Sequence, residues 1–325
     1  MIIPQYWAEG VAKYRKKEKQ ITVRRFGWSD TSILEAQSNA DRLANEALQK
    51  ILAGEKLHKR DPKIAYGGGL GLPIREEIIA RHEDVIITRN AYGAKCMNTP
   101  NVLFADIDFK DKSVFKSGFI IYCLLMCLFW FMGMFHHTFM LKILVIISSI
   151  PISRFIAESI QSFKKKLKGG DLKIARKKIE DFLLKNPRWS LRLYQTPAGL
   201  RIIATHQLFK PNETIVGDFF KALDVDSVYA FMCLNQNCFR ARLTPKPWRI
   251  GIKDHLRPRP GIWPVAEDQL PKRNEWLKIY DEKSVDFAAC SFLETLGSGL
   301  INAEVRKVID LHDQLSKANQ KLPIA

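Results

Sequence analysis

The stretch NVLFADIDFKDKSVFKSGFIIYCLLMCLFWFMGMF, residues 101–135, joins a short strand pattern to a segment apolar enough to enter a membrane. The strand pattern ends in two acids separated by one residue, Asp106 and Asp108. Residues i and i+2 of a strand project from the same face, so both carboxylates are able to reach one hard cation. The pattern therefore predicts a Mg²⁺ or Mn²⁺ site, the alternative being two solvated acids at a strand end.

The apolar segment is long enough for two short membrane spans. No Asp, Glu, Lys or Arg occurs in residues 117–141, and apolar residues continue to Ile152. A helix needs about 20 residues to cross a hydrocarbon core of roughly 30 Å. We therefore expect a transmembrane hairpin over residues 117–155. Its parts would be spans at 118–135 and 139–155 and a turn at His136-His137-Thr138.

The flanks of this hairpin are rich in lysine and arginine. KDKSVFK, residues 110–116, precedes it, and RFIAESIQSFKKKLKGGDLKIARKK, residues 154–178, follows it. The positive-inside rule places both flanks in the cytoplasm, so we expect an inner-membrane protein with both termini cytoplasmic. The alternative is one long span over residues 118–141, which would put the two soluble halves on opposite sides.

The composition favours acidic partners. The chain has 51 Lys and Arg against 34 Asp and Glu, a formal net charge of +17. Nucleic acid, nucleotides and the anionic cytoplasmic leaflet all fit this charge, although membrane proteins are often basic at their cytoplasmic margins. The six cysteines lack the spacing of a zinc site and indicate reduced cytosolic thiols.

Outside the hairpin, strand and helix patterns alternate. They run in the order strand, strand, helix, strand, strand, helix, strand, which predicts an α+β fold with an antiparallel sheet covered on one face by helices. Because the ends of a loop lie close together, a hairpin inserted there returns the chain to the same domain. The expected parts are an N-terminal helical region (1–84), a split α+β domain (85–116 and 170–250), the transmembrane hairpin (117–155), and a C-terminal proline-rich segment with helices (251–325).

Two strand patterns carry cations suited to phosphate. RLYQTPAGLRIIATH, which we interpret as two strands joined by a Thr-Pro-Ala-Gly turn, contains Arg192, Arg201 and His206, and CFRARLTPKPW contains Arg240 and Arg242. Arginine suits bidentate phosphate contacts, and histidine suits a phosphate or a transferring proton. The alternative is that these side chains form salt bridges within the sheet.

Two further groups lie near these strands. Lys246 and Trp248 follow the second strand, and a cation beside an indole is typical of surfaces that bind a nucleic-acid backbone and stack bases. Asp224 and Asp226 are available as a third metal ligand, although one of them would suit the cap of the following helix.

This order of motifs resembles the catalytic core of archaeo-eukaryotic-type primases and primase-polymerases. The resemblance covers roughly residues 85–248. It implies a palm-like sheet of the RNA-recognition-motif type, two or three metal-binding acids and a histidine that contacts the incoming nucleotide. Asp106 and Asp108 match the first motif.

The second and third motifs depart from the family pattern. Arg201 stands after Gly-hydrophobic, where the family commonly has histidine, unless His206 takes that role. The late strand CFRARL has no acid, so Asp224 or Asp226 would have to serve as the third ligand. A zinc cluster is also missing, and a membrane hairpin is foreign to the pattern.

Two hypotheses about function follow. In the first, a membrane-anchored domain facing the cytoplasm binds nucleotide or nucleic-acid phosphates through a divalent metal and carries out nucleotidyl transfer. Its catalytic residues would be Asp106, Asp108 and His206; its phosphate-binding residues would be Arg192, Arg201, Arg240, Arg242 and Lys246; and its metal ligands would be Asp106, Asp108, Asp224 and Asp226.

The second hypothesis is a non-catalytic integral membrane protein whose basic sheet binds nucleic acid or a partner. Two other classes share single motifs with the chain. LFADIDFKDKS resembles the first metal motif of diguanylate cyclases, whose Gly-Gly-Asp/Glu-Glu-Phe signature is absent. Asp-x-Asp is also used by membrane-bound glycosyltransferases.

Overall fold

The computed structural model describes residues 3–16, 19–61, 73–109, 114–131, 133, 139–167, 169–259 and 261–325. The chain divides into two compact units. The larger contains Met1–Ile107 and Phe182–Ala325, and the smaller contains Asp108–Asp181. The predicted α+β class, with antiparallel sheets and helices, is confirmed.

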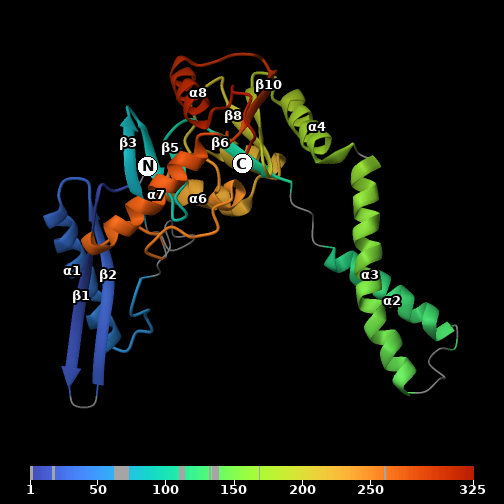
Figure 1. Ribbon diagram of the computed structural model, residues 1–325, viewed down its shortest axis with the longest axis horizontal. Coiled ribbons are helices and arrows are strands. Elements are labelled where there is room, and N and C mark those ends of the chain that lie inside the picture. The colour runs from blue at the N-terminus through green and yellow to red at the C-terminus, as the bar shows by residue number, and fades with distance from the viewer. Residues whose placement is uncertain are drawn as a thin grey trace. The chain divides into compact units, whose positions relative to one another are not determined.

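The larger unit begins with a long β-hairpin covered by a helix (Figure 1). β1 (Tyr6–Lys16) pairs antiparallel with β2 (Lys19–Ser29), and α1 (Ile33–Leu52) packs along both strands. The side chain of Ser32 accepts a hydrogen bond from the backbone N–H of Glu35 and so caps α1. Residues 1–84, expected to be helical, therefore contain three strands that were not predicted: β1, β2 and β3 (Glu77–His82).

Glycines allow α1 to lie directly on the hairpin. A Cβ atom added to Gly27 would lie 2.2 Å from the backbone nitrogen of Ala40, and one added to Gly10 would meet the same residue.

We expect Gly27→Ala to lower the free energy of unfolding by about 3 kcal/mol, because the helix must move away from the strands. Chemical denaturation measures this. The control is Gly217→Ala, a position in a helix where an added Cβ atom meets no atom within 4 Å. An equal loss of stability in this variant would contradict the explanation.

One four-stranded antiparallel sheet has the order β3-β4-β5-β9. Every residue of β4 is buried, so this strand lies inside the unit. Trp276 and Tyr280 of a helix pack with Ala94 and Ile250 in one apolar cluster near this sheet. The elements are β3 (Glu77–His82), β4 (Val85–Arg89), β5 (Lys95–Thr99), β9 (Phe239–Arg242) and α7 (Leu270–Ser284).

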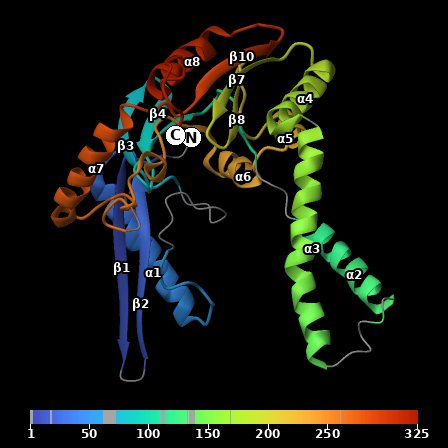
Figure 2. The ribbon, with the colours of Figure 1, turned by 45° about the vertical axis from the view of Figure 1, so that its right-hand side comes forward.

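The second four-stranded sheet has the order β10-β7-β8-β6. The predicted Thr-Pro-Ala-Gly turn is confirmed, since β7 ends at Thr196 and β8 begins at Gly199. Figure 2 shows α8 beside β10 and β7. The elements are β6 (Phe104–Asp108), β7 (Ser190–Thr196), β8 (Gly199–Ala204), β10 (Ser291–Gly297) and α8 (Ala303–Ser316).

The predicted strands do not form one continuous sheet. The acid-bearing β6 lies beside β8, whereas the arginine-bearing β9 lies beside β5. β10 belongs to the C-terminal region 251–325, where a proline-rich segment and helices but no strand were expected. Tyr229 of α6 (Ser227–Gln236) joins the two sheets, because its hydroxyl lies 3.0 Å from the carbonyl oxygen of Phe104 and 3.1 Å from that of Arg240.

The smaller unit is helical. It contains α2 (Phe115–Phe131), α3 (Phe139–Leu167) and most of α4 (Gly170–Lys185). α2 packs on α3, where buried residues recur at a spacing of four. Three of them are small, which allows close helix contact. The buried stripe is Val145, Ser149, Ser153 and Ala157.

One helical segment in the described part of the chain is long and apolar enough to cross a membrane. It is Lys142–Phe163, within α3, judged by length and composition. α2 is apolar but has only 17 residues. The expected two-helix transmembrane hairpin is therefore not shown. The expected turn at residues 136–138 lies outside the described residues, and α3 continues past the expected end at Phe155.

Candidate functional site

Asp106 of β6 faces Arg201 of the neighbouring strand β8. The guanidinium donates from Nε to Oδ1 at 2.9 Å and from Nη2 to Oδ2 at 3.3 Å, so both carboxylate oxygens are engaged. The Arg201 side chain is 2% exposed and that of Asp106 is 34% exposed. Burial alone would lower the pKa of Arg201, but the charge of Asp106 outweighs it and holds the pKa above its ordinary value.

Further contacts hold Arg201 in place. Its Nη1 donates to the carbonyl oxygen of Arg242 at 2.7 Å and lies 3.4 Å from Nε2 of His312. A divalent metal binds through carboxylate oxygens, and here a buried cation already neutralises those of Asp106. In this structure, Asp106 of the predicted acid pair is therefore paired with an arginine.

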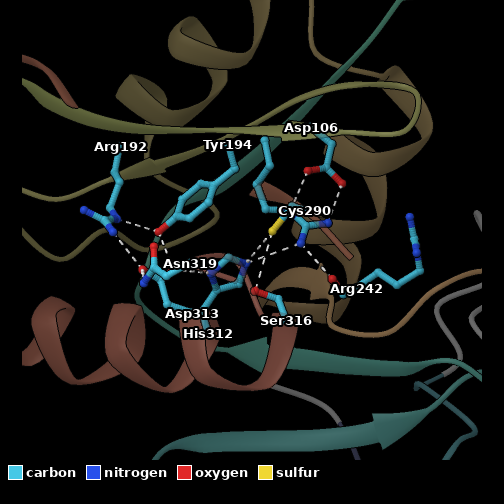
Figure 3. Close-up of polar contacts among 10 residues, drawn as sticks. Asp106, Arg192, Tyr194, Arg242, Cys290, His312, Asp313, Ser316 and Asn319 are labelled. Atoms are coloured by element: carbon cyan, nitrogen blue, oxygen red, sulfur yellow. Dashed lines mark hydrogen bonds and ion pairs between the residues drawn. The ribbon is translucent and has the colours of Figure 1, made fainter. Parts of the chain in front are cut away.

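A network of polar side chains continues from Arg201 into α8 (Figure 3). His312 Nδ1 lies 3.0 Å from Oδ1 of Asp313, and both residues are buried. Tyr194 donates its hydroxyl to Oδ1 of Asp313 at 2.6 Å, and Arg192 donates from Nη2 to Oδ2 at 2.7 Å. These contacts assign the Nδ1 proton of His312 to Asp313 and leave Nε2 as an acceptor for Arg201.

Asp313 is the charged centre of this network. Burial alone would raise the pKa of Asp313, but hydrogen bonds from His312, Tyr194 and Arg192 outweigh it and hold the pKa below its ordinary value of 3.8. Asn319 also donates to Oδ2 at 3.3 Å. The carboxylate therefore carries a full negative charge beside Arg192 at neutral pH.

Cys290 extends the network on its other side. Its Sγ lies 3.9 Å from Nε2 of His312 and 3.5 Å from Oγ of Ser316. Burial alone would raise the pKa of Cys290. The contact with His312 and the charge of Arg201 outweigh burial and hold the pKa below its ordinary value of 9.0. Cys290, His312 and Asp313 have the residue types of a nucleophile, a base and an orienting acid. Cys290 and His312 have no exposed area, so a substrate does not reach the sulfur in this conformation.

The arginines of β9 also have protein partners. Arg240 donates from Nη2 to Glu76 at 2.5 Å and from Nη1 to Asn98 at 2.9 Å. Arg242 donates from Nη1 to the carbonyl oxygens of Thr244 and Ala325. The contacts of Arg192, Arg240 and Arg242 thus match the alternative of internal pairing better than that of an open phosphate surface.

His206 packs away from the acid pair. Its Nδ1 accepts a hydrogen bond from the backbone N–H of Ser190 at 3.3 Å, and its ring contacts Trp189 and Phe209. Burial lowers its pKa. These contacts place His206 in an aromatic cluster and give no support for a role in proton transfer at Asp106.

The other predicted metal ligands lie around α6. Asp224 adopts a left-handed backbone conformation with φ of 58°, and Asp226 occupies the N-cap position of α6 without a capping hydrogen bond from its side chain. In the described part of the chain, no group of three or more His, Cys, Asp or Glu side chains is arranged to hold a metal ion. The structure thus brings Asp106 together with Arg201, and the described residues show no set of three acids that would hold a metal ion.

Half-buried Lys246 and exposed Trp248 lie beside each other at the start of a basic loop. Trp248 is 56% exposed, its ring meets that of Tyr92 edge-on at 5.3 Å, and the ammonium of Lys246 lies 5.4 Å from the indole centroid. We call residues 246–259 the basic loop. It contains Lys246, Arg249, Lys253, His255, Arg257 and Arg259 against the single acid Asp254.

The sequence analysis missed His312, Asp313 and Cys290. One signal was available for α8, because its buried Val305, Val308 and Ile309 recur at helical spacing and His312 continues the stripe. A histidine in an apolar stripe needs a polar partner inside the protein. No sequence pattern of this kind pointed to Cys290, which follows two alanines.

Comparisons of this chain with protein-family models, with curated proteins and with solved structures find no match.

Proposed function

We propose that the protein is a membrane-anchored, non-catalytic protein whose primase-like α+β unit binds single-stranded nucleic acid through the basic loop. The observation that carries the non-catalytic part is the contact of Arg201 with both oxygens of Asp106. This favours the second of the two sequence-based hypotheses over metal-dependent nucleotidyl transfer.

The energetics of Arg201 support this choice. To admit a metal between Asp106 and Asp108, the guanidinium must leave a site where it is 2% exposed and lose its bond to the carbonyl oxygen of Arg242. A buried arginine that loses its counter-charge is strongly unfavourable. Asp224 and Asp226, the residues that would complete the metal site, lie at the start of α6 and not on the strands that carry Asp106 and Arg201.

The basic loop supports binding of a nucleic-acid strand. Exposed Trp248 offers a face on which a base stacks, and Lys246 adds a cation beside that face. Edge contact with Tyr92 holds the indole in one orientation, which lowers the entropy that binding must overcome. The cations of the loop follow the phosphates, and this part of the affinity falls as salt rises.

The membrane anchor in this proposal is α3. Its segment Lys142–Phe163 has the length and apolar character of a span, and basic residues follow it in α4. By the positive-inside rule these residues face the cytoplasm, where a nucleic acid is present. The second span of the hairpin, through α2, remains part of the proposal.

Replacing Trp248 with alanine tests the stacking role. We expect the dissociation constant for a single-stranded oligonucleotide to rise about tenfold, because one stacked base contributes roughly 1–3 kcal/mol. Fluorescence anisotropy in detergent micelles measures this at fixed salt. The matched control is Phe231→Ala, which removes another exposed aromatic of the same unit. Equal effects of the two changes, or no binding by the wild type, would refute the proposal.

An incorporation assay tests the absence of catalysis. We expect no Mg²⁺- or Mn²⁺-dependent nucleotide incorporation by the full-length protein with a primed or unprimed template. Incorporation that Asp108→Ala abolishes would restore the first hypothesis, because Asp108 is exposed and its removal leaves the Arg201 pair intact.

A further inference from the structure

Three arginines are buried close to β3 and α7, away from the site described above. Arg75 precedes β3, Arg89 ends β4 and Arg273 lies in the first turn of α7. Their exposed fractions are 5%, 5% and 1%. Arginine is almost never buried to this extent without matching acids, so the partners of each guanidinium decide what the group does.

The acids around this group are shared among several cations. Glu77 Oε2 lies 2.8 Å from Nη2 of Arg273 and 3.9 Å from Nε of Arg89. Asp281 lies 3.4 Å from Nη2 of Arg89 and 3.7 Å from the ammonium of Lys95. Glu77 and Asp281 are thus shared by three cations, and the two acids whose charges act on Arg75, Asp61 and Glu9, also pair with Arg25 and Arg24.

Several N–H groups of these arginines lack acceptors. Among the described residues, none lies within hydrogen-bond distance of Nη1 of Arg75 or of Nε and Nη1 of Arg273, although all three atoms are buried. A buried donor without an acceptor costs about 1–3 kcal/mol, and more when it is charged. Two such guanidinium groups therefore mark a place where an anionic acceptor would be stabilising.

Aromatic rings compensate only part of this charge. The guanidinium of Arg75 lies 3.4 Å from the ring centroid of Phe26, and that of Arg273 lies 5.7 Å from the ring centroid of Trp263. Stacking stabilises the charge of the planar group, but its N–H groups lie in that plane and point past the ring. Burial lowers the pKa of Arg75 to about 10, which agrees with incomplete compensation.

Trp263 brings the two arginines to one place. Its carbonyl oxygen accepts a hydrogen bond from Nε of Arg75 at 3.0 Å, and its ring faces Arg273. The segment that carries Trp263 reaches the surface at Pro264, which is exposed. Displacement of this segment is the step that would open the arginines to a ligand.

We propose that Arg75 and Arg273 form a binding site for a phosphate group, separate from the basic loop and from Asp106. The fork of a guanidinium matches two oxygens of a phosphate, and both arginines carry buried N–H groups without acceptors among the described residues. A phosphate offers more acceptor oxygens to these N–H groups than a carboxylate does. The phosphate is either free inorganic phosphate or the terminal phosphate of a nucleotide, and these two sources share the same contacts.

The test is titration of the full-length protein in detergent micelles with inorganic phosphate and, separately, with ADP. Isothermal calorimetry measures binding, and the ionic strength is held constant with chloride. We expect saturable binding of at least one probe with one site per chain, together with a rise in the melting temperature. If only ADP binds, the site takes a nucleotide; if both bind, the phosphate alone is sufficient. Failure of both probes to bind would overturn the proposal.

Variants locate the binding. Arg75→Gln and Arg273→Gln are expected to weaken phosphate binding at least tenfold, whereas Lys272→Gln, which removes an exposed cation beside Arg273 in α7, leaves it unchanged. Arg75→Lys keeps the charge but loses the fork, and it provides a second test if Arg273→Gln does not fold. Undiminished binding by Arg75→Gln would also overturn the site. Trp248→Ala should leave phosphate binding intact, so the two proposals fail independently.

Discussion

Replacing Asp106 with alanine is expected to lower the free energy of unfolding by about 3–5 kcal/mol. The change leaves the guanidinium of Arg201 buried at 2% exposure without a counter-charge, and breaking a buried ion pair from one side costs about this much. Chemical denaturation of the full-length protein in detergent micelles measures the loss. Asp106 itself is one-third exposed, so the cost arises from Arg201.

Asp108→Ala is the matched control for this prediction. Asp108 lies two residues further along β6, and its side chain is exposed, so we expect a change within about 0.5 kcal/mol. If the two acids served one metal ion, both substitutions would abolish metal binding, and neither would destabilise the metal-free protein. Similar stability for Asp106→Ala and wild type would contradict the pairing role.

A double substitution separates charge pairing from packing. Replacing both partners, Asp106→Leu with Arg201→Met, removes the buried charge together with its counter-charge. We expect this variant to be more stable than Asp106→Ala, since no unpaired ion remains. A double variant that is less stable than Asp106→Ala would show that Arg201 acts mainly through its contacts with Arg242 and His312.

Asp313→Asn is expected to have an effect of similar size, about 3 kcal/mol of lost stability. Its carboxylate accepts from Tyr194 at 2.6 Å and from Arg192 at 2.7 Å, and His312 lies 3.0 Å away. The amide keeps one acceptor but loses the charge that balances Arg192. The control is Asp310→Asn on the exposed face of the same helix, where we expect little change. Equal losses in the two variants would exclude the network as the cause.

The same variant gives a pH dependence. The pKa of Asp313 is lower in the folded protein than its ordinary 3.8, so the ionised carboxylate stabilises the fold above that pH. This contribution is lost as the pH falls through the folded pKa. We therefore expect the difference in melting temperature between wild type and Asp313→Asn to shrink as the pH falls below about 4. A difference that stays constant would indicate that the charge of Asp313 is not what stabilises the network.

The proposed function depends on which residue pairs with Asp106. A strand with Asp-x-Asp beside a strand with arginine fits both a metal site and an ion pair. The contact between Arg201 and Asp106 decides for the ion pair in this structure. Arg75 and Arg273 differ from Arg201, because buried N–H groups of both lack an acceptor among the described residues. Neither residue was predicted from the sequence as part of a site.

Local pattern alone was sufficient for several features of this protein. The α+β class, the strand pair around residues 196–199 and the apolar segment before Gly170 follow from periodicity and turn residues, which act between near neighbours. Asp106 and Arg201 were recognisable as candidates from their positions on strands. Their pairing was not, because residue types carry no information about which strands become neighbours.

Only the tertiary structure decided the partners of the cations. Arg192 meets Asp313, which lies 121 residues away, and Arg240 meets Glu76, which lies 164 residues away. The order of strands in the two sheets places β8 beside β6 and β9 beside β5, and this order results from the packing of the whole larger unit. Ion pairs act over a few ångströms, so their identity is settled only when distant segments meet.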